Sequence, residues 1–179
     1  CQRQTGTASH RGLASFSARA IDRAKGKSVV SRMLLRARHI FPVSSPSIED
    51  GFMRLDGGRI SEIGPWGECS NQSEAEDLGE VILMPGLVNA HCHLNYTDFV
   101  GAIPPTSSFT EWIRAIVDLK ADVDDAAHQA SWLRGAQQCL NHGITTLGNI
   151  ETRRDLLPYL WSQTPLRMVS FLEIILLQP

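Results

Sequence analysis

The sequence predicts an α/β fold with parallel strands, and three observations support this prediction. Short apolar stretches at residues 87–90, 144–149 and 168–172 have the length and the aliphatic and β-branched content of buried strands. Apolar residues recur at helical spacing between the first two stretches. The first stretch ends in His91 and His93, and parallel α/β barrels place their chemistry at the carboxyl ends of the strands. We therefore expect the beginning of a parallel barrel.

The spacing of His91 and His93 suggests half of a metal site. Residues two apart on a strand point to the same side, so both imidazoles can bind one ion, while Cys92 packs on the opposite face. A His pair near a strand end is by itself more often a structural feature. Here an apolar stretch at 81–84 and a Pro85-Gly86 turn lead into the strand, which favours a metal site. Catalytic zinc usually has three protein ligands, so further ligands must come from elsewhere.

Residues 33–84 predict a small β-sheet. Residues 52–55 and 59–63 alternate as strands, and Asp56-Gly57-Gly58 between them is a strong hairpin signal. Two or three short strands do not bury a core alone, so this sheet needs partners.

Two helices are predicted between the first two barrel strands. Ser108 and Glu111 have capping-box spacing at the start of the first, in which each side chain binds the other residue's amide. Its apolar stripe is expected to be buried and comprises Phe109, Trp112, Ile113 and Ile116. The second helix is expected to bury Ala126, Ala130, Leu133 and Leu140. It ends at His142, and Gly143 provides a left-handed cap.

Glu151 and Glu173 follow the second and third barrel strands. Both side chains could face the pocket at the strand ends. We favour solvent-facing carboxylates or structural partners of a nearby arginine.

Residues 1–32 differ in composition, with seven Lys or Arg and the single acid Asp22. The segment resembles an organellar transit peptide, which is rich in Arg and Ser and poor in acids. Alternatively it is an upstream, non-native translated stretch, and Met33 is the start. We favour the second interpretation and expect a disordered segment in either case.

The composition is that of an ordinary water-soluble chain. Charged residues make up 20% of it and the net charge is -2, so nothing suggests a nucleic-acid partner or a membrane surface. No apolar run reaches the length of about 18 residues that a membrane-spanning helix needs. The four cysteines form no Cys-x-x-Cys pair. We expect reduced thiols and a cytoplasmic protein.

Three sequence motifs, in order and well separated, resemble those of the amidohydrolase superfamily, in particular of its aminohydrolase and chlorohydrolase branch. They are the ten residues from Pro85 to Leu94, the five from Phe109 to Ile113, and the five from His142 to Thr146. The first motif is specific to the family, and the other two motifs support it. The resemblance covers roughly residues 33–179, and within this branch the sequence is similar to S-adenosylhomocysteine or aminodeoxyfutalosine deaminases.

The resemblance implies a metal-dependent (β/α)₈ TIM barrel preceded by strands of a small composite β-sandwich. Residues 33–84 would form part of the sandwich and residues 85–179 the first strands and helices of a truncated barrel. His91 and His93 would be metal ligands, while the remaining ligands and the acid/base Glu would lie beyond the chain end. A complete barrel has roughly 250 residues, so we expect an N-terminal fragment.

The implied activity is hydrolysis of a C–N bond. The favoured reaction is deamination of a purine nucleoside or related ring by a metal-activated water. The alternatives are other hydrolases of the superfamily that act on a chlorinated triazine, guanine or a cyclic amide. Zinc is the expected divalent metal, although iron and manganese also accept His-x-His ligands. The partner is then a small-molecule substrate, and a homo-oligomer is compatible with the sequence.

Glu111 has a second interpretation through this resemblance. In nucleoside deaminases of the branch, a Glu in a similar Phe-x-Glu-Trp motif contacts sugar hydroxyls of the substrate. Glu111 is therefore a candidate substrate-binding residue as well as a helix cap.

The alternative to an enzyme is a non-catalytic protein, a truncated remnant of the same fold. Two ligands hold a catalytic metal poorly, and three barrel strands leave a parallel edge exposed. The fragment alone is expected to be inactive.

Overall fold

The computed structural model describes residues 32–174 and divides into two compact units. The first unit contains the described residues up to Ile40 and Ile48–Ile82, and the second contains Phe41–Ser47 and the described residues from Leu83 onward. Apart from Arg32, the segment 1–32, predicted to be disordered or upstream, lies outside the described residues.

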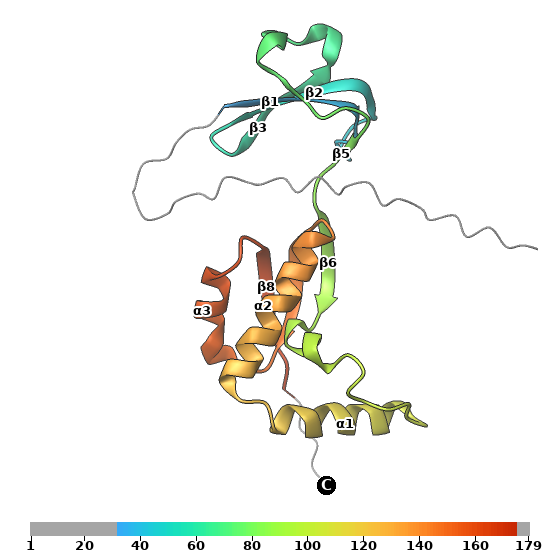
Figure 1. Ribbon diagram of the computed structural model, residues 1–179, viewed down its shortest axis with the longest axis vertical. Coiled ribbons are helices and arrows are strands. Elements are labelled where there is room, and N and C mark those ends of the chain that lie inside the picture. Colours follow the sequence, from blue (N-terminus) through green and yellow to red (C-terminus); the bar gives the residue numbers. More distant parts are fainter. Residues whose placement is uncertain (1–31, 175–179) are drawn as a thin grey trace, which may run out of the picture. The chain divides into compact units, whose positions relative to one another are not determined.

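The first unit is a small sheet with strand order β3-β2-β1-β4, in which β5 also pairs with β1 (Figure 1). The antiparallel strands β1, β2 and β3 carry most of the pairing, while the short β4 runs parallel to β1. The strand bounds are Met33–Ile40 (β1), Ile48–Asp56 (β2), Arg59–Pro65 (β3), Glu76–Asp77 (β4) and Ile82–Leu83 (β5). Gly57 and Gly58 have φ of 59° and 77°, which suits the turn of the predicted β2–β3 hairpin. Two 3-10 turns, η2 (Trp66–Glu68) and η3 (Gln72–Glu74), follow β3.

The second unit is a mixed α/β structure around a parallel sheet of order β6-β7-β8. The strands are β6 (Leu87–Cys92), β7 (Ile144–Glu151) and β8 (Arg167–Leu172). The helices are α1 (Phe109–Ala121), α2 (Asp125–Asn141) and α3 (Leu157–Ser162), with 3-10 turns η4 (Leu94–Phe99) and η5 (Arg154–Leu156). The three parallel strands predicted from the sequence therefore all form. In the described part, no helix is long and apolar enough to cross a membrane.

One face of this sheet carries the core of the second unit. The helices α2 and α3 lie against it (Figure 1), and the buried cluster comprises Leu94, Trp132, Ala136, Leu147, Leu160 and Leu166. Met168 of β8 packs against this cluster, whereas its neighbours Val169 and Phe171 are 58% and 52% exposed. Because side chains alternate along a strand, the opposite face of the sheet is apolar and uncovered within the described residues.

The predicted buried stripe of α1 is wrong in its N-terminal half. Phe109 is 74% exposed and Trp112 is 40% exposed, while Ile116 is buried. The rings of Phe109 and Trp112 stack on each other, with centroids 5.7 Å apart.

The predicted buried face of α2 is correct only in part, since Leu133 and Leu140 are partly buried and pack against the core cluster. Ala126 is exposed, and the buried residues are His128, Ser131, Trp132, Gly135 and Ala136. These five recur at helical spacing, but two of them are polar. The apolar pattern does not indicate the polar members of this face, because they are buried through hydrogen bonds to other elements.

Candidate functional site

His91 and His93 lie at the carboxyl end of β6, and the structure brings their rings together. The ring centroids are 5.4 Å apart with an interplanar angle of 65°. Pairing with β7 is irregular between Asn89 and Cys92, and the Asn89 Oδ1 accepts a hydrogen bond of 3.1 Å from the His91 amide. His91 is exposed and His93 is partly buried. Two adjacent imidazoles on one side of a strand end are a suitable pair of metal ligands.

The surroundings of His93 favour its neutral form. Burial, assisted by His91 and Lys120, lowers the pKa of His93 against the opposing effect of Glu173 and Glu151. A metal ligand must be a neutral imidazole, so this shift suits the predicted role. No group of three or more His, Cys, Asp or Glu side chains among residues 32–174 is placed to hold a metal ion. The donor set thus fits part of a site and needs at least one more ligand.

A column of stacked rings adjoins His93. Tyr96 lies 4.6 Å from His93, centroid to centroid, with an interplanar angle of 3°, and Phe99 stacks on Tyr96 at 5.4 Å. From α1, the ammonium of Lys120 donates a hydrogen bond of 3.2 Å to the Tyr96 hydroxyl and lies 5.3 Å from the ring centroid. Burial raises the pKa of Tyr96 to about 12, so its hydroxyl stays protonated. No sequence motif indicated Tyr96 or Lys120. One pattern could have indicated Lys120, because it follows Ile113 and Ile116 at helical spacing and so lies on the same face of the helix.

The turn η4 that carries Tyr96 is fixed to β7 and α2. The Leu94 amide donates a 3.1 Å hydrogen bond to the side-chain carbonyl of buried Asn149. The Ser131 hydroxyl donates to the Asn95 carbonyl at 3.0 Å and accepts from the Asp98 amide at 3.2 Å. The residue after the histidine pair is therefore anchored by neighbouring elements of the same unit.

Glu151 points toward α2 and is 1% exposed. Its carboxylate lies 3.3 Å from Nε2 of buried His128 and accepts from the amides of Thr152 at 2.6 Å and Arg153 at 3.0 Å. Burial acts to raise the pKa of Glu151, but these hydrogen bonds outweigh it and hold the pKa below its usual value. The expectation of a solvent-facing carboxylate is wrong for Glu151. It is a structural partner, of a histidine rather than an arginine.

Glu173 has a different environment. It follows β8 and lines a hollow of about 560 Å³ between α1 and the carboxyl ends of β7 and β8. The other lining residues are Val117, Lys120, Ala121, Thr152, Leu172 and Ile174. Glu173 Oε2 is buried and has no hydrogen-bond partner within the described part of the chain.

Glu111 caps the exposed N-terminal end of α1. Its amide donates to the Ser108 hydroxyl at 3.2 Å, as the capping box predicts, but its carboxylate binds mainly Ser107, whose amide and hydroxyl both lie 2.9 Å from Oε2. These hydrogen bonds from Ser107 lower the pKa of Glu111.

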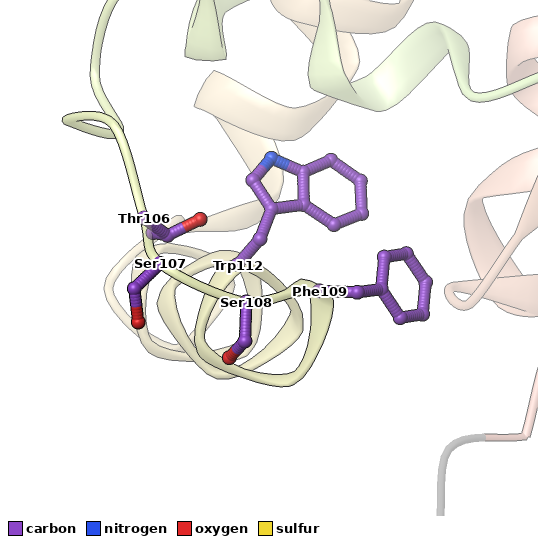
Figure 2. Close-up of a pocket in the computed structure, with 5 residues that line it drawn as sticks. All are labelled: Thr106, Ser107, Ser108, Phe109 and Trp112. Carbon is purple, nitrogen blue, oxygen red and sulfur yellow. The ribbon is translucent and has the colours of Figure 1, made fainter.

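An open hollow of about 490 Å³ adjoins this end of α1. It is lined by Thr106, Ser107, Ser108, Phe109 and Trp112 (Figure 2). About 14 Å of helix axis separates Glu111 from Lys120. The hydrogen bonds that the structure describes for Glu111 all stay within its own turn and do not reach the histidine pair.

Comparisons with known proteins agree with this geometry. Residues 82–160, which include both histidines and Glu111, match the amidohydrolase family. A 5-methylthioadenosine/S-adenosylhomocysteine deaminase of Moorella thermoacetica is 32% identical over 71 residues, which are 38% of this chain and 17% of that protein. The chain thus spans less than a fifth of this relative's length.

Solved structures share the fold. An aminofutalosine deaminase of Helicobacter pylori, in complex with methylthio-coformycin, has a TM-score of 0.59 at 22% identity over 79% of this chain and 35% of that one. An adenosine deaminase from Xanthomonas campestris with bound zinc has a TM-score of 0.60 at 20% identity over 76% of this chain and 33% of that one. These comparisons confirm the predicted resemblance: part of this chain is similar to the amidohydrolase family, and curated deaminases are among its similar proteins.

Proposed function

We propose that the protein containing this chain is a metal-dependent aminohydrolase that releases ammonia from a purine nucleoside or a related aminated ring. The observation that carries the proposal is the adjacent pair of imidazoles of His91 and His93 at the carboxyl end of a parallel strand. The pair lies within the segment that matches the amidohydrolase family. Zinc is the favoured metal, and it is bound in one of the similar structures.

We further propose that the described strands belong to a (β/α)₈ barrel. The apolar face that presents Val169 and Phe171 supports this, because a closed barrel would bury it as packed interior. The sheet of the first unit would then be part of the composite β-sandwich.

In this proposal His91 and His93 hold the metal, together with ligands from elsewhere in the protein. A bound zinc ion lowers the pKa of water toward about 7 and so supplies a nucleophile at neutral pH. The burial of His93 keeps its imidazole neutral for binding. The overall reaction consumes water, replaces the amino group of the ring by an oxygen, and releases ammonia.

Glu111 is proposed to bind hydroxyl groups of the substrate. A carboxylate only accepts hydrogen bonds and is suited to two adjacent hydroxyl donors. The aromatic side chains of Phe109 and Trp112, which line the hollow at the same end of α1, offer a surface for the rest of a nucleoside (Figure 2).

The test is metal content and ammonia release, measured on the protein expressed from its complete gene. Methylthioadenosine, S-adenosylhomocysteine, adenosine and guanine are the substrates to try. Replacing both histidines (His91→Ala with His93→Ala) should remove one equivalent of metal and reduce ammonia release to background. A His142→Ala control should keep both, since His142 binds the Gln138 carbonyl at the end of α2. Equal metal content in the double variant and the parent would contradict the proposal.

A further inference from the structure

The hollow between α1 and the ends of β7 and β8 combines apolar and charged walls. Val117, Leu172 and Ile174 contribute apolar surface, while Lys120 and Glu173 contribute opposite charges. Its volume of about 560 Å³ is within the range of roughly 300–1,000 Å³ that small-molecule sites occupy.

Glu173 contrasts with Glu151, the acid at the end of the neighbouring strand. The Glu151 carboxylate receives hydrogen bonds from His128 and from the amides of Thr152 and Arg153. The Glu173 Oε2 is equally hidden from water but accepts no hydrogen bond within residues 32–174. A buried carboxylate oxygen without a donor has lost its hydration and gained nothing in exchange. Glu173 is only partly buried as a residue and lines the hollow, so its carboxylate is suited to a donor that arrives with a ligand.

Lys120 supplies the complementary group. Its ammonium has three N–H donors, and the structure assigns one of them to the Tyr96 hydroxyl at 3.2 Å. Burial lowers the pKa of Lys120, while Glu173 and Glu151 act in the opposite direction and favour the cation.

Through Tyr96, which stacks on His93 at 4.6 Å, the charged wall of the hollow adjoins the histidine pair. A molecule in the hollow would therefore lie next to the position where the proposed reaction occurs.

We propose that this hollow binds a substrate group that presents an N–H or O–H donor to Glu173 and an acceptor atom to Lys120, with its apolar surface against Val117, Leu172 and Ile174. The edge of a nitrogen heterocycle, or an amide or amino-acid group attached to one, has this chemistry. Glu173 and Lys120 are thus assigned as substrate-binding residues. The assignment rests on the proposed aminohydrolase function and adds a recognition site to it.

The first test measures stability without substrate, in the protein expressed from its complete gene. Glu173→Gln should leave the urea unfolding midpoint unchanged or raise it, because Oε2 accepts no hydrogen bond within residues 32–174 that the substitution could break. Glu151→Gln is the matched variant and should lower the midpoint, because it disturbs a fully bonded carboxylate. A decrease for Glu173→Gln as large as that for Glu151→Gln would show a structural role and would overturn the assignment, whatever the activity.

The second test measures kinetics with the compound from the same panel that releases ammonia fastest. Glu173→Gln and Lys120→Met should each reduce kcat/KM at least 10-fold, mainly through KM, while zinc content stays at the parent level. Asp118→Asn, an exposed acid on the same helix, is the control and should behave like the parent. Unchanged kcat/KM in both hollow variants would overturn the assignment while the aminohydrolase function stands. If the parent releases no ammonia from any compound, the proposed function fails, and the stability comparison alone decides whether Glu173 serves a ligand or the fold.

Discussion

At the scale of single residues, the buried contact between Glu151 and His128 joins the end of β7 to α2. The contact distance is 3.3 Å, and both side chains are almost completely buried. The low pKa of Glu151 makes this contact a source of pH-dependent stability.

We predict that Glu151→Gln flattens the acid side of the stability profile. The folded-state pKa of Glu151 lies below the ordinary value of 4.5, so its contribution to stability is complete above that value and is lost as the pH falls through the folded-state pKa. At pH 7 the variant should lose about 1–3 kcal/mol, since amide hydrogen bonds replace charge-assisted ones. Urea unfolding between pH 7 and pH 3 measures both effects.

In that experiment the parent should lose more stability than Glu151→Gln on acidification. Parallel curves for the two proteins would mean that Glu151 does not couple folding to protons.

Sequence patterns identified some of these residues and missed others for a physical reason. His91 and His93 could be found because their spacing is local and strand geometry places them together. The roles of Glu151 and Glu173 could not be separated, because the difference depends on which face of the sheet each side chain joins. That choice depends on the partners available across the fold.

At the scale of elements, the close approach of α2 to the turn η4 depends on Gly135. A Cβ added at Gly135 would overlap the Thr97 hydroxyl and would lie 3.0 Å from the Leu94 carbonyl oxygen. Both neighbouring groups belong to the turn that follows the histidine pair, so contact between these two elements requires a residue without a side chain.

We predict that Gly135→Ala destabilises the protein by about 1–3 kcal/mol, as overpacked sites do. The propensity of alanine for helices acts in the opposite direction but is smaller, at most about 1 kcal/mol. Gly67→Ala is the control, since an added Cβ there meets nothing within 4 Å. Chemical unfolding of both variants measures the effect, and a Gly135→Ala variant as stable as the control would show that the turn can move away from α2.

Helix and strand positions were predicted well, and helix faces only in part. Gly143, with φ of 77°, ends α2 as expected, and Asp56-Gly57-Gly58 leads β2 into β3. These signals act within a few residues. The buried face of α2 includes His128 and Ser131, whose burial depends on hydrogen bonds to Glu151 and Asn95 from distant parts of the chain.

At the scale of the whole molecule, the uncovered face of the parallel sheet has a direct consequence. Val169 and Phe171 expose apolar surface beside the edge strand β8, and large exposed apolar patches mark interaction surfaces or aggregation sites. The three-stranded sheet of the second unit therefore needs a partner for this face.

We predict that residues 32–174 produced alone bind a hydrophobic dye and self-associate, whereas the protein expressed from its complete gene does neither. Replacing Val169 and Phe171 by Thr should reduce dye fluorescence of the short protein. Dye fluorescence and sedimentation measure the outcome, with Ser162→Thr on exposed α3 surface as a control. If the short protein remains monomeric and binds no dye, the prediction that this apolar face is exposed in it is wrong.

Because η4 is anchored, sequence changes in the loop before α1 need not affect the positions of the histidine pair. Because β7 and α2 hold the residues that follow the histidine pair, the chain from Gly101 to Ser107 can vary in length and sequence without displacing His91 or His93. The Lys120 contact to Tyr96 connects α1 back to that anchored turn. In the proposed enzyme, new substrate preferences can therefore arise by altering the loop and the start of α1, while the two proposed metal ligands keep their arrangement.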